Sequence, residues 1–184
     1  MLDLILAKVW SDLSIPVGNS PNPFRLIQLA TVDADGQPKV STVVLRDADT
    51  LTRSIFFYVD KRSAKYTEML AEPRVGIASI DPTGKLQLRC EGLAESLMDT
   101  SLLAQHWVHA RDRTQALFRH GNIPGEAIPL PSTAYETHRD GFENFAVVAV
   151  HLNKVEWLDL TQDIHQRARF IWQGEHWQAS WIAP

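Results

Sequence analysis

Hydrophobic positions near the N-terminus follow a helical period. Leu2, Ile5, Leu6 and Val9 lie three or four residues apart, which predicts an amphipathic helix over residues 1–13. The next stretch, SIPVGNSPNP, contains three prolines, which predict the end of that helix. From residue 24 the pattern changes to alternating or continuous apolar runs, which are typical of strands.

Strand patterns separated by turn sequences dominate the rest of the chain. Hairpins are predicted around DADGQP, around DPTG and around the final QGE. The predicted strands cover residues 25–32, 39–46, 53–60, 74–80, 85–97, 144–160 and the two arms of 168–184. Two helical patterns, over 100–110 and 113–121, precede a proline-rich loop.

The spacing of these elements predicts the fold class. Strands joined by short antiparallel turns, with helices between them, favour an antiparallel barrel with peripheral helices over a doubly wound sheet. We expect one β-rich α+β domain over residues 1–184. Its predicted parts are the N-terminal helix (1–13), barrel strands (24–98), helices (99–120) and C-terminal strands (144–184).

Composition narrows the class of protein. The chain has 184 residues, of which 45% are hydrophobic and 22% charged, as is usual for one globular domain. A single cysteine indicates a reducing compartment, and no apolar run has the length of a membrane-spanning helix. The net charge of −4 argues against nucleic-acid binding. The N-terminal segment contains Asp3 and is a poor signal peptide, so we expect a soluble cytoplasmic protein without nucleic-acid or membrane partners.

A short helix is predicted directly after the strand at 53–60. Ser63 is a suitable N-cap, and Tyr66, Met69 and Leu70 have the i, i+3, i+4 spacing of an apolar stripe. Pro73 ends the helix.

The start of this helix is rich in positive charge. Lys61 and Arg62 precede Ser63, and Lys65 lies in the first turn. Cations are unfavourable at a helix N-terminus, but together with free amides they suit a bound anion, especially a phosphate. The alternative is that all three side chains are simply solvated.

The strand at 39–46 adds a second feature. On an ideal strand Thr42, Val44 and Arg46 share one face, and Phe56 and Tyr58 share a face of the strand at 53–60. An apolar wall with an aromatic ring and cations at its edge would suit a planar heteroaromatic ligand that carries a phosphate. Ordinary core packing of Phe56 and Tyr58 is the alternative.

Five segments in this order, STVVLR, FFYVDKRSAK, LQLRCEGLAE, VEWLDL and the C-terminal HQR with WIAP, resemble the pyridoxamine phosphate oxidase family of FMN-binding split barrels. The resemblance covers residues 24–184 and is greatest to the uncharacterised branch of that family. It implies a split β-barrel and a homodimer that holds FMN at its interface and acts on a small-molecule substrate.

The resemblance also implies roles for individual residues. Lys65 matches the lysine that binds the FMN phosphate, and Gln87 matches a glutamine that reaches the cofactor from the other subunit. The remaining positions that match cofactor contacts, or lie beside them in the same segments, are Ser41, Thr42, Val43, Val44, Leu45, Arg46, Tyr58, Val59, Arg62, Ser63, Trp157 and Arg167.

Some of these positions have other readings. Gln87 could be an ordinary exposed strand residue, and Trp157 could pack at the rim of the barrel. Arg169 replaces Arg167 as the candidate if the register differs by two residues. Trp181 stands where an arginine is usual in the family's C-terminal signature.

Two flavin positions depart from the family pattern. Ser41 stands in place of a phosphate-binding arginine, and Ala64 stands where the oxidase has a second arginine. The loss of two charge-assisted contacts lowers the expected affinity for FMN. We expect Arg62 and Lys61 to compensate from the loop.

Substrate positions depart further. A gapless count places Gln105, His109 and Arg113 where the oxidase grips the substrate phosphate with tyrosine, arginine and serine. His165 is retained near the C-terminus, but Asp163 takes the place of an arginine, and a carboxylate repels a phosphate dianion. Efficient turnover of pyridoxamine phosphate is therefore not expected; the alternative is that Arg111, Arg113 or Arg169 restores the contact with the phosphate.

Other chemistry has little support in the sequence. The seven histidines lack metal-ligand spacing, and Cys90 lies on the apolar face of its strand. The leading hypothesis is an FMN-dependent oxidoreductase whose catalytic residues are unknown. The alternatives are a non-catalytic module that binds flavin or haem for storage or sensing, and a structural protein.

Overall fold

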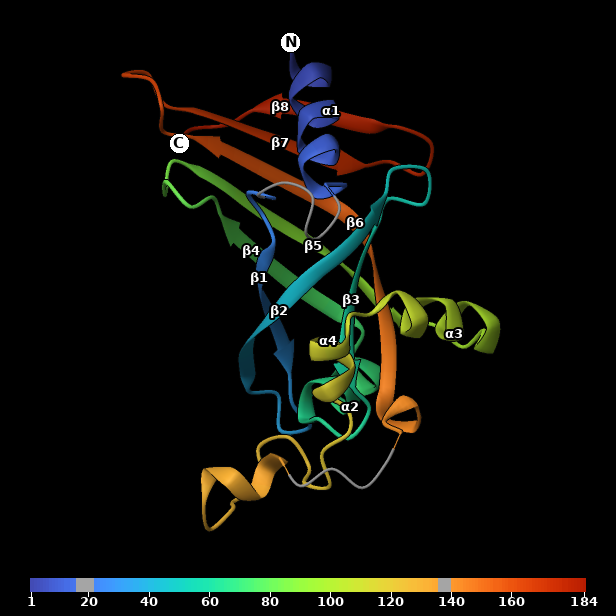
Figure 1. Ribbon diagram of the computed structural model, residues 1–184. Coiled ribbons are helices and arrows are strands. Elements are labelled where there is room, and N and C mark those ends of the chain that lie inside the picture. The colour runs from blue at the N-terminus through green and yellow to red at the C-terminus, as the bar shows by residue number, and fades with distance from the viewer. Residues whose placement is uncertain (16–21, 136–139) are drawn as a thin grey trace.

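The computed structural model describes residues 1–15, 22–135 and 140–184 (Figure 1). Residues 16–21 of the predicted proline-rich break lie outside this description. The helices and strands, in chain order, are α1 (Leu2–Leu13), β1 (Leu26–Val32), β2 (Pro38–Asp49), β3 (Ser54–Asp60), α2 (Ala64–Ala71), β4 (Arg74–Ile80), β5 (Leu86–Ser96), α3 (Thr100–His109), α4 (Asp112–Ala116), β6 (Phe145–Asp159), β7 (Gln166–Trp172) and β8 (Trp177–Trp181), with 3-10 helices at Pro131–Tyr135 and Phe142–Asn144.

The strands form an antiparallel barrel. Their order is β3-β2-β1-β4-β5-β6, and the pairing of β3 with β6 closes six strands into a ring. Strands β7 and β8 extend the sheet beyond β6 at the top of Figure 1, where both termini also lie. The predicted fold class, an antiparallel split barrel with peripheral helices, is confirmed.

The barrel closes incompletely beside β2. Strand β3 pairs with β2 only from Leu45 onward, with a register shift between Leu45 and Asp47. Beyond that point β3 pairs with β6 alone, and residues 38–44 of β2 pair only with β1. We call residues 38–44 the open edge of β2, because among the described residues no strand pairs with their second side.

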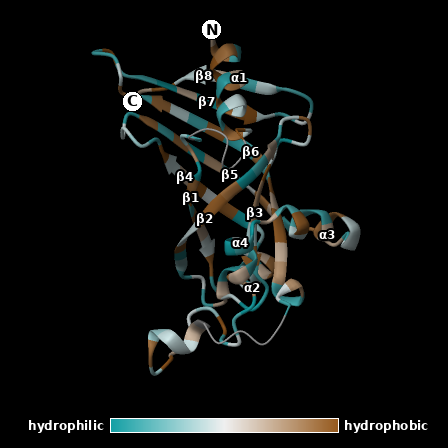
Figure 2. Ribbon diagram, in the orientation of Figure 1, coloured by the Kyte–Doolittle hydropathy of each residue, from teal (hydrophilic) through white to brown (hydrophobic). Residues whose placement is uncertain are grey.

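The barrel interior holds the main hydrophobic core. Figure 2 shows that hydrophobic residues concentrate on the strands, whereas most turns are hydrophilic. Helix α1 packs against β2 and β8 and contributes the buried side chains of Val9, Trp10 and Leu13. Met69 of α2 joins the same cluster from the lower part of the barrel in Figure 1.

A second hydrophobic cluster lies outside the barrel, where α3 and the segment after α4 cover β3 and β6. Its buried members are Leu103, Phe118, Phe145 and Val147. Tyr58 packs against this cluster from the outer side of β3. The alternative of core packing is therefore observed for one part of the Tyr58 side chain, and another part of it lines a pocket.

Helix α4 is shorter than the sequence predicts. The pattern predicts a helix over 113–121, but α4 ends at Ala116. The chain then turns, since the side-chain amide of Asn144 donates to the carbonyl of Phe118 (2.9 Å) and draws that residue into the second cluster. A contact with a residue 26 positions away thus holds the chain just beyond the end of the helix.

Helix α2 begins where the sequence predicts but differs in detail. Ser63 occupies the N-cap position, yet its hydroxyl donates to the carbonyl of Asp60 (2.6 Å) instead of accepting from an amide of the helix. Leu70, predicted in the apolar stripe, is 61% exposed.

No helix in the described ranges is long and apolar enough to cross a membrane.

Candidate functional site

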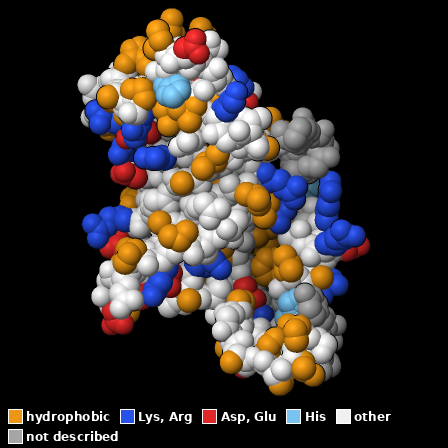
Figure 3. All heavy atoms as spheres, turned by 90° about the vertical axis from the view of Figure 1, so that its left-hand side faces the viewer, with side chains coloured by type: hydrophobic (Ala, Val, Ile, Leu, Met, Phe, Trp, Pro, Cys, Tyr) orange, Lys and Arg blue, Asp and Glu red, His pale blue; other side chains and the backbone are white. Residues whose placement is uncertain are grey.

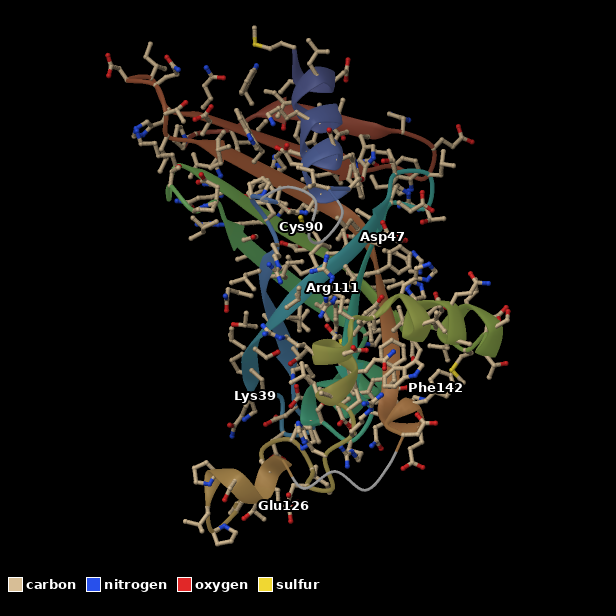
Figure 4. All side chains as sticks on the ribbon, viewed as in Figure 1. Lys39, Asp47, Cys90, Arg111, Glu126 and Phe142 are labelled. Carbon is tan, nitrogen blue, oxygen red and sulfur yellow. The ribbon has the colours of Figure 1, made fainter. Side chains whose placement is uncertain are left out.

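Two hollows lie beside β2, one at the open edge and one beyond it, where β2 begins to pair with β3. The first, here the α2 pocket, has a volume of about 390 Å³ and is lined by Thr31, Lys39, Ser41, Ser63, Ala64, Lys65, Glu68, Pro124 and Gly125. The second, here the arginine pocket, has a volume of about 550 Å³ and is lined by Arg46, Asp47, Tyr58, Gln105, His106, His109, Ala110 and Arg111. Figure 4 labels Lys39 and Asp47, which mark the two ends of β2.

Two lysines line the α2 pocket, and they differ in their contacts. Lys39 forms an ion pair with Asp33 (2.9 Å), which raises the pKa of the lysine. Lys65 makes no hydrogen bond or ion pair within the described part of the chain. Glu68 accepts a hydrogen bond from Thr31, so the carboxylate in this pocket is held by a hydroxyl rather than by a lysine.

Other donors in the α2 pocket also lack partners. The Ser41 hydroxyl is shielded from solvent and has no hydrogen-bond partner in the described structure. The N-terminal end of α2 has no side-chain cap, because the Ser63 hydroxyl is directed to Asp60. An unpaired lysine, an unpaired hydroxyl and an uncapped helix start are the donors that an organic phosphate requires. This donor set fits the phosphate of FMN.

Arg62 does not compensate for the missing arginines in the way expected from the sequence. Its guanidinium binds Asp60 through Nε (3.0 Å) and Nη2 (2.7 Å) and donates to the carbonyl of His120 (2.9 Å). It lines a different hollow, of about 260 Å³, next to the loop around Pro124. Lys61 is exposed and does not line the α2 pocket. The second cation of that pocket is Lys39 instead.

The middle of β2 presents backbone rather than side chains to a ligand. Val43, Leu45 and, on β3, Val59 are buried in the barrel core. The N–H of Leu45 donates to the carbonyl of Arg25, on the β1 side. Alternate residues of a strand direct their backbone N–H and C=O groups to opposite sides. The backbone N–H and C=O groups of Thr42 and Val44 therefore point away from β1, toward the open edge.

The arginine pocket combines an aromatic ring with positive charge. The guanidinium of Arg46 lies 5.0 Å from the centre of the Tyr58 ring, a cation–π distance. The Nε of Arg46 is shielded and has no partner in the described residues, and Nη2 donates to the Thr114 hydroxyl at a long 3.4 Å. Arg46 therefore has unused hydrogen-bonding capacity beside the pocket.

Tyr58 and His106 form a contact across the same pocket. The Tyr58 hydroxyl lies 3.3 Å from Nδ1 of His106. Burial raises the pKa of Tyr58, against the opposing effect of the Arg46 charge, and burial lowers the pKa of His106. Both groups are therefore biased toward their neutral forms, in which each can donate or accept a hydrogen bond.

Gln87, Trp157 and Arg167 lie away from both pockets. Gln87 and Arg167 both pair with Leu158 of β6, so the two side chains share the outer face of the sheet. Arg167 binds Glu156 (2.6 Å) and lines a fourth hollow, of about 290 Å³. Trp157 packs against the barrel core, so it faces the other side of its strand.

Of the remaining residues proposed from the sequence, some line a pocket and others are exposed elsewhere. Gln105 and His109 line the arginine pocket, whereas Arg113 is exposed and does not. Asp163 and His165 are exposed in the loop between β6 and β7 and contribute to neither pocket.

Among the titratable residues of the two pockets, four were not singled out from the sequence: Lys39, Asp47, Glu68 and His106. Lys39 precedes Ser41 by two residues, and strand alternation could have indicated it. The others depend on how α2, α3 and the chain after α3 approach β2 and β3, which no local pattern shows.

A Ser-His-Glu row and the single cysteine contain chemically reactive side chains outside these pockets. Ser54, His151 and Glu95 form a row with contacts of 2.8 and 2.9 Å, but Ser54 is fully buried, so a substrate cannot reach its hydroxyl. Burial raises the pKa of the Cys90 thiol, as predicted for an inert core cysteine. The residues described contain no cluster suited to a metal ion.

The closed six-stranded barrel with pockets beside β2 defines a split-barrel protein. The sequence model of the family described as pyridoxamine 5'-phosphate oxidase matches residues 21–156. The chain belongs to this family.

Individual relatives agree with this assignment. A pyridoxine/pyridoxamine 5'-phosphate oxidase of Anaeromyxobacter dehalogenans (strain 2CP-C) is 25% identical over 191 residues, which cover 97% of this chain and 94% of that protein. A pyridoxamine 5'-phosphate oxidase-related, FMN binding protein from Nostoc punctiforme PCC 73102 is similar in structure, with a TM-score of 0.76, 24% identity and 87% of each chain covered. PhzG from Burkholderia lata 383, solved with tetrahydrophenazine-1-carboxylic acid, has a TM-score of 0.78 at 18% identity, covering 99% of this chain and 92% of that one. At these identities the two structures support the fold alone.

Proposed function

We propose that this chain is an FMN-binding flavoprotein that acts as an oxidoreductase on a substrate other than pyridoxamine phosphate. One observation carries the proposal. Three donors converge in the α2 pocket, although the chain is acidic overall: Lys65 and the shielded Ser41 hydroxyl, neither of which has a partner among the described residues, and the uncapped start of α2. Such a concentration of unused donors matches a phosphate monoester.

The proposed ligand extends from the α2 pocket along β2. Its phosphate contacts Lys65 and Ser41, and its ring system lies toward Arg46 and Tyr58. Five residue steps separate Ser41 from Arg46, about 16 Å along a strand, which suits an extended ribityl phosphate and a three-ring system. The backbone groups of Thr42 and Val44 supply hydrogen bonds between the two ends, while Val43, Leu45 and Val59 support the strands from the core.

The proposed assembly is a homodimer with FMN at the subunit interface. Gln87 and Arg167 share one face of the sheet but line neither pocket at β2 in their own chain. This placement supports a role for them at the flavin of the partner subunit. Trp157 packs into its own core, so its proposed role is to support that face of the sheet.

The chemistry divides between cofactor and protein. When bound, FMN supplies hydride transfer at N5 of its ring system. Lys65 neutralises phosphate charge, Tyr58 packs beside the ring, and Arg46 places positive charge at the substrate end. The neutral Tyr58–His106 pair is able to hold or pass a proton beside the ring.

The absorption spectrum of the purified protein tests the proposal directly. We expect flavin bands, retained after gel filtration or restored by added FMN, and bleaching on addition of NADPH or NADH. A haem spectrum would overturn the flavin assignment. A colourless protein that ignores added FMN would favour the structural alternative, and bound FMN that neither NADPH nor NADH reduces would favour storage or sensing.

Assembly is tested by sedimentation of the FMN-free and FMN-loaded protein. If each flavin site needs Gln87 from a second chain, FMN binding must stabilise the dimer, because a ligand favours the state that binds it. Full FMN affinity in a stable monomer would contradict the interface site.

A further inference from the structure

The arginine pocket contains more positive charge than its own residues neutralise. Arg46 and Arg111 line it, and Arg25 is close enough to act on Arg46. Burial lowers the pKa of Arg46, and the charges of Arg25 and Arg111 lower it further. None of the three forms an ion pair within the described residues. Basic side chains also gather at the right-hand margin of the face shown in Figure 3.

Other arginines of the same chain show what Arg46 lacks. Arg62 holds Asp60 through Nε and Nη2, and Arg74 holds Glu72 through the same two atoms at 2.8 and 2.6 Å. The corresponding edge of Arg46 has no acceptor on Nε and only the long contact to Thr114. This planar edge matches a carboxylate with two parallel hydrogen bonds.

The wall of the pocket is aromatic. The rings of Tyr58 and His106 meet edge to face, with centres 5.8 Å apart, and Phe56 stacks on His106 at 6.4 Å. Ala110 adds an apolar surface. A planar ring can pack on such a wall while its charged end meets the arginines.

The charge of the pocket favours a monoanion. Among the residues that line the pocket, histidines not counted, Arg46 and Arg111 contribute two positive charges and Asp47 one negative charge, which leaves a formal charge of +1 in the lining; Arg25 lies outside the lining. A carboxylate neutralises this charge. A phosphate dianion exceeds it and is repelled by Asp47.

We propose that the arginine pocket binds a planar aromatic carboxylate, held by Arg46 and Arg111 against the Tyr58 and His106 rings. This inference rests on the proposed function in one respect, namely that the bound carboxylate is the substrate that lies beside FMN. Binding turns the Nε–Nη2 edge of Arg46 into the pocket, and Arg111 closes over the carboxylate from the chain after α3.

Calorimetric titration with three probes tests the site: 2-naphthoate, its neutral analogue 2-naphthamide, and 2-naphthyl phosphate. Each probe is titrated into the FMN-free and the FMN-loaded protein. We expect naphthoate to bind at least about tenfold more tightly than either of the other probes, the effect of one charge-assisted contact. Equal binding of naphthamide, or tighter binding of the phosphate, would overturn the proposal.

Variants locate the contact. Arg46→Gln and Arg111→Gln should each weaken naphthoate about tenfold or more and leave naphthamide within about twofold. Arg113→Gln is the matched control, since Arg113 is exposed two residues beyond Arg111 and does not line the pocket. A loss in Arg113→Gln equal to that in Arg111→Gln would show a general charge effect and sink the assignment.

The two forms of the protein separate this inference from the proposed function. Naphthoate binding that FMN abolishes would identify the pocket as the flavin's own and overturn the substrate role. Carboxylate selectivity in a protein that never binds FMN would contradict the proposed function and leave the carboxylate site standing. Tight FMN binding without carboxylate selectivity would refute only the inference made here.

Discussion

Basic side chains have opposite surroundings in two regions of this barrel. On the outer face of β5, β6 and β7, Glu156 accepts a hydrogen bond from Arg167 (2.6 Å) and pairs with Lys154 (3.3 Å), which also binds Glu91 (2.8 Å). Beside the open edge of β2, Lys65 and the two arginines of the arginine pocket have no such acceptor in the described structure.

The difference teaches how to separate structural charges from ligand-binding charges. A pair of opposite charges in one chain satisfies itself and contributes to folding. Converging cations that form no ion pair with a carboxylate repel one another and oppose folding, so they indicate an anion from outside the chain. The predictions below test this distinction, from the largest expected effect to the smallest.

The largest effect concerns pyridoxamine phosphate as a substrate. Asp47 lines the arginine pocket together with Gln105 and His109, the two positions that the family resemblance matches to phosphate-binding side chains of the oxidase. We expect kcat/KM for pyridoxal phosphate formation at least about a thousandfold below that of an authentic oxidase, since attractive contacts are lost and a repulsive one is added.

An oxygen-dependent assay beside an authentic oxidase measures this difference. Turnover within about tenfold of the oxidase would mean that the unpaired arginines accept a phosphate dianion after all. Asp163→Arg is the follow-up: a gain in phosphate-substrate binding would place that exposed loop at the mouth of the site, and no gain would place it elsewhere.

Lys65→Ala should separate ligand binding from stability. We expect FMN affinity to fall by about 1.5–3 kcal/mol, the range for a charge-assisted hydrogen bond, with riboflavin unchanged because it lacks the phosphate. The midpoint of urea unfolding should hardly change, since Lys65 loses no hydrogen bond or ion pair to any residue that the structure describes.

Lys61→Ala is the matched control for this variant. Lys61 is exposed four residues away and does not line the α2 pocket, so FMN affinity should remain within about 0.5 kcal/mol of the parent protein. Equal losses of FMN and riboflavin in a folded Lys65→Ala protein would refute the phosphate assignment.

Glu156→Gln should show the reverse behaviour. The Glu156 side chain is only 12% exposed, and its replacement leaves Arg167 and Lys154 with a weaker acceptor. We expect a loss of about 1–3 kcal/mol in the free energy of unfolding, measured as a lower urea midpoint at unchanged m.

Glu95→Gln is the comparison for Glu156→Gln. Glu95 is 72% exposed and contacts His151 at 2.9 Å, so its replacement should change stability by less than about 0.5 kcal/mol. If both variants lose the same small amount, the outer face is not held together by its charges and the contrast between the two regions fails.

The smallest effect is a pH dependence at Glu156. Burial opposes ionisation of this carboxyl, but hydrogen bonds from Arg167 and Lys154 outweigh it and hold the pKa below the ordinary 4.5. A depressed folded pKa contributes stability above the ordinary value, and this contribution is lost as pH falls through the folded pKa. The stability gap between the parent protein and Glu156→Gln should therefore narrow below about pH 4.5; a gap constant from pH 7 to pH 3 would exclude this role.

The sequence predicts elements where local patterns decide the outcome. In β5 the alternation of Leu88 and Cys90 with Arg89 and Glu91 gives the buried and exposed faces correctly. It fails where a distant contact decides, as at α4, whose end depends on Asn144. The barrel class follows from antiparallel turns, which are local signals.

The candidate site divides in the same way. The family resemblance indicates Lys65, Ser41 and Arg46, and all three line pockets beside β2. Arg62 has its carboxylate two residues earlier, at Asp60, so its pairing could have been anticipated from the sequence. Arg111 and His106 reach the site only through the docking of α3, and sequence pattern cannot supply that information.

The open edge of β2 has a consequence for association between chains. A strand with one unpaired side is a template on which another chain can add a strand, which leads to aggregation. Pro38, which has no N–H, begins this edge, Lys39 places a charge on it, and the irregularity after Leu45 distorts its far end. Each of these features discourages a second strand from pairing there. The backbone between these features has no strand paired with its second side among the described residues. The barrel therefore discourages strand addition by another chain at the edge where we propose that a small molecule binds.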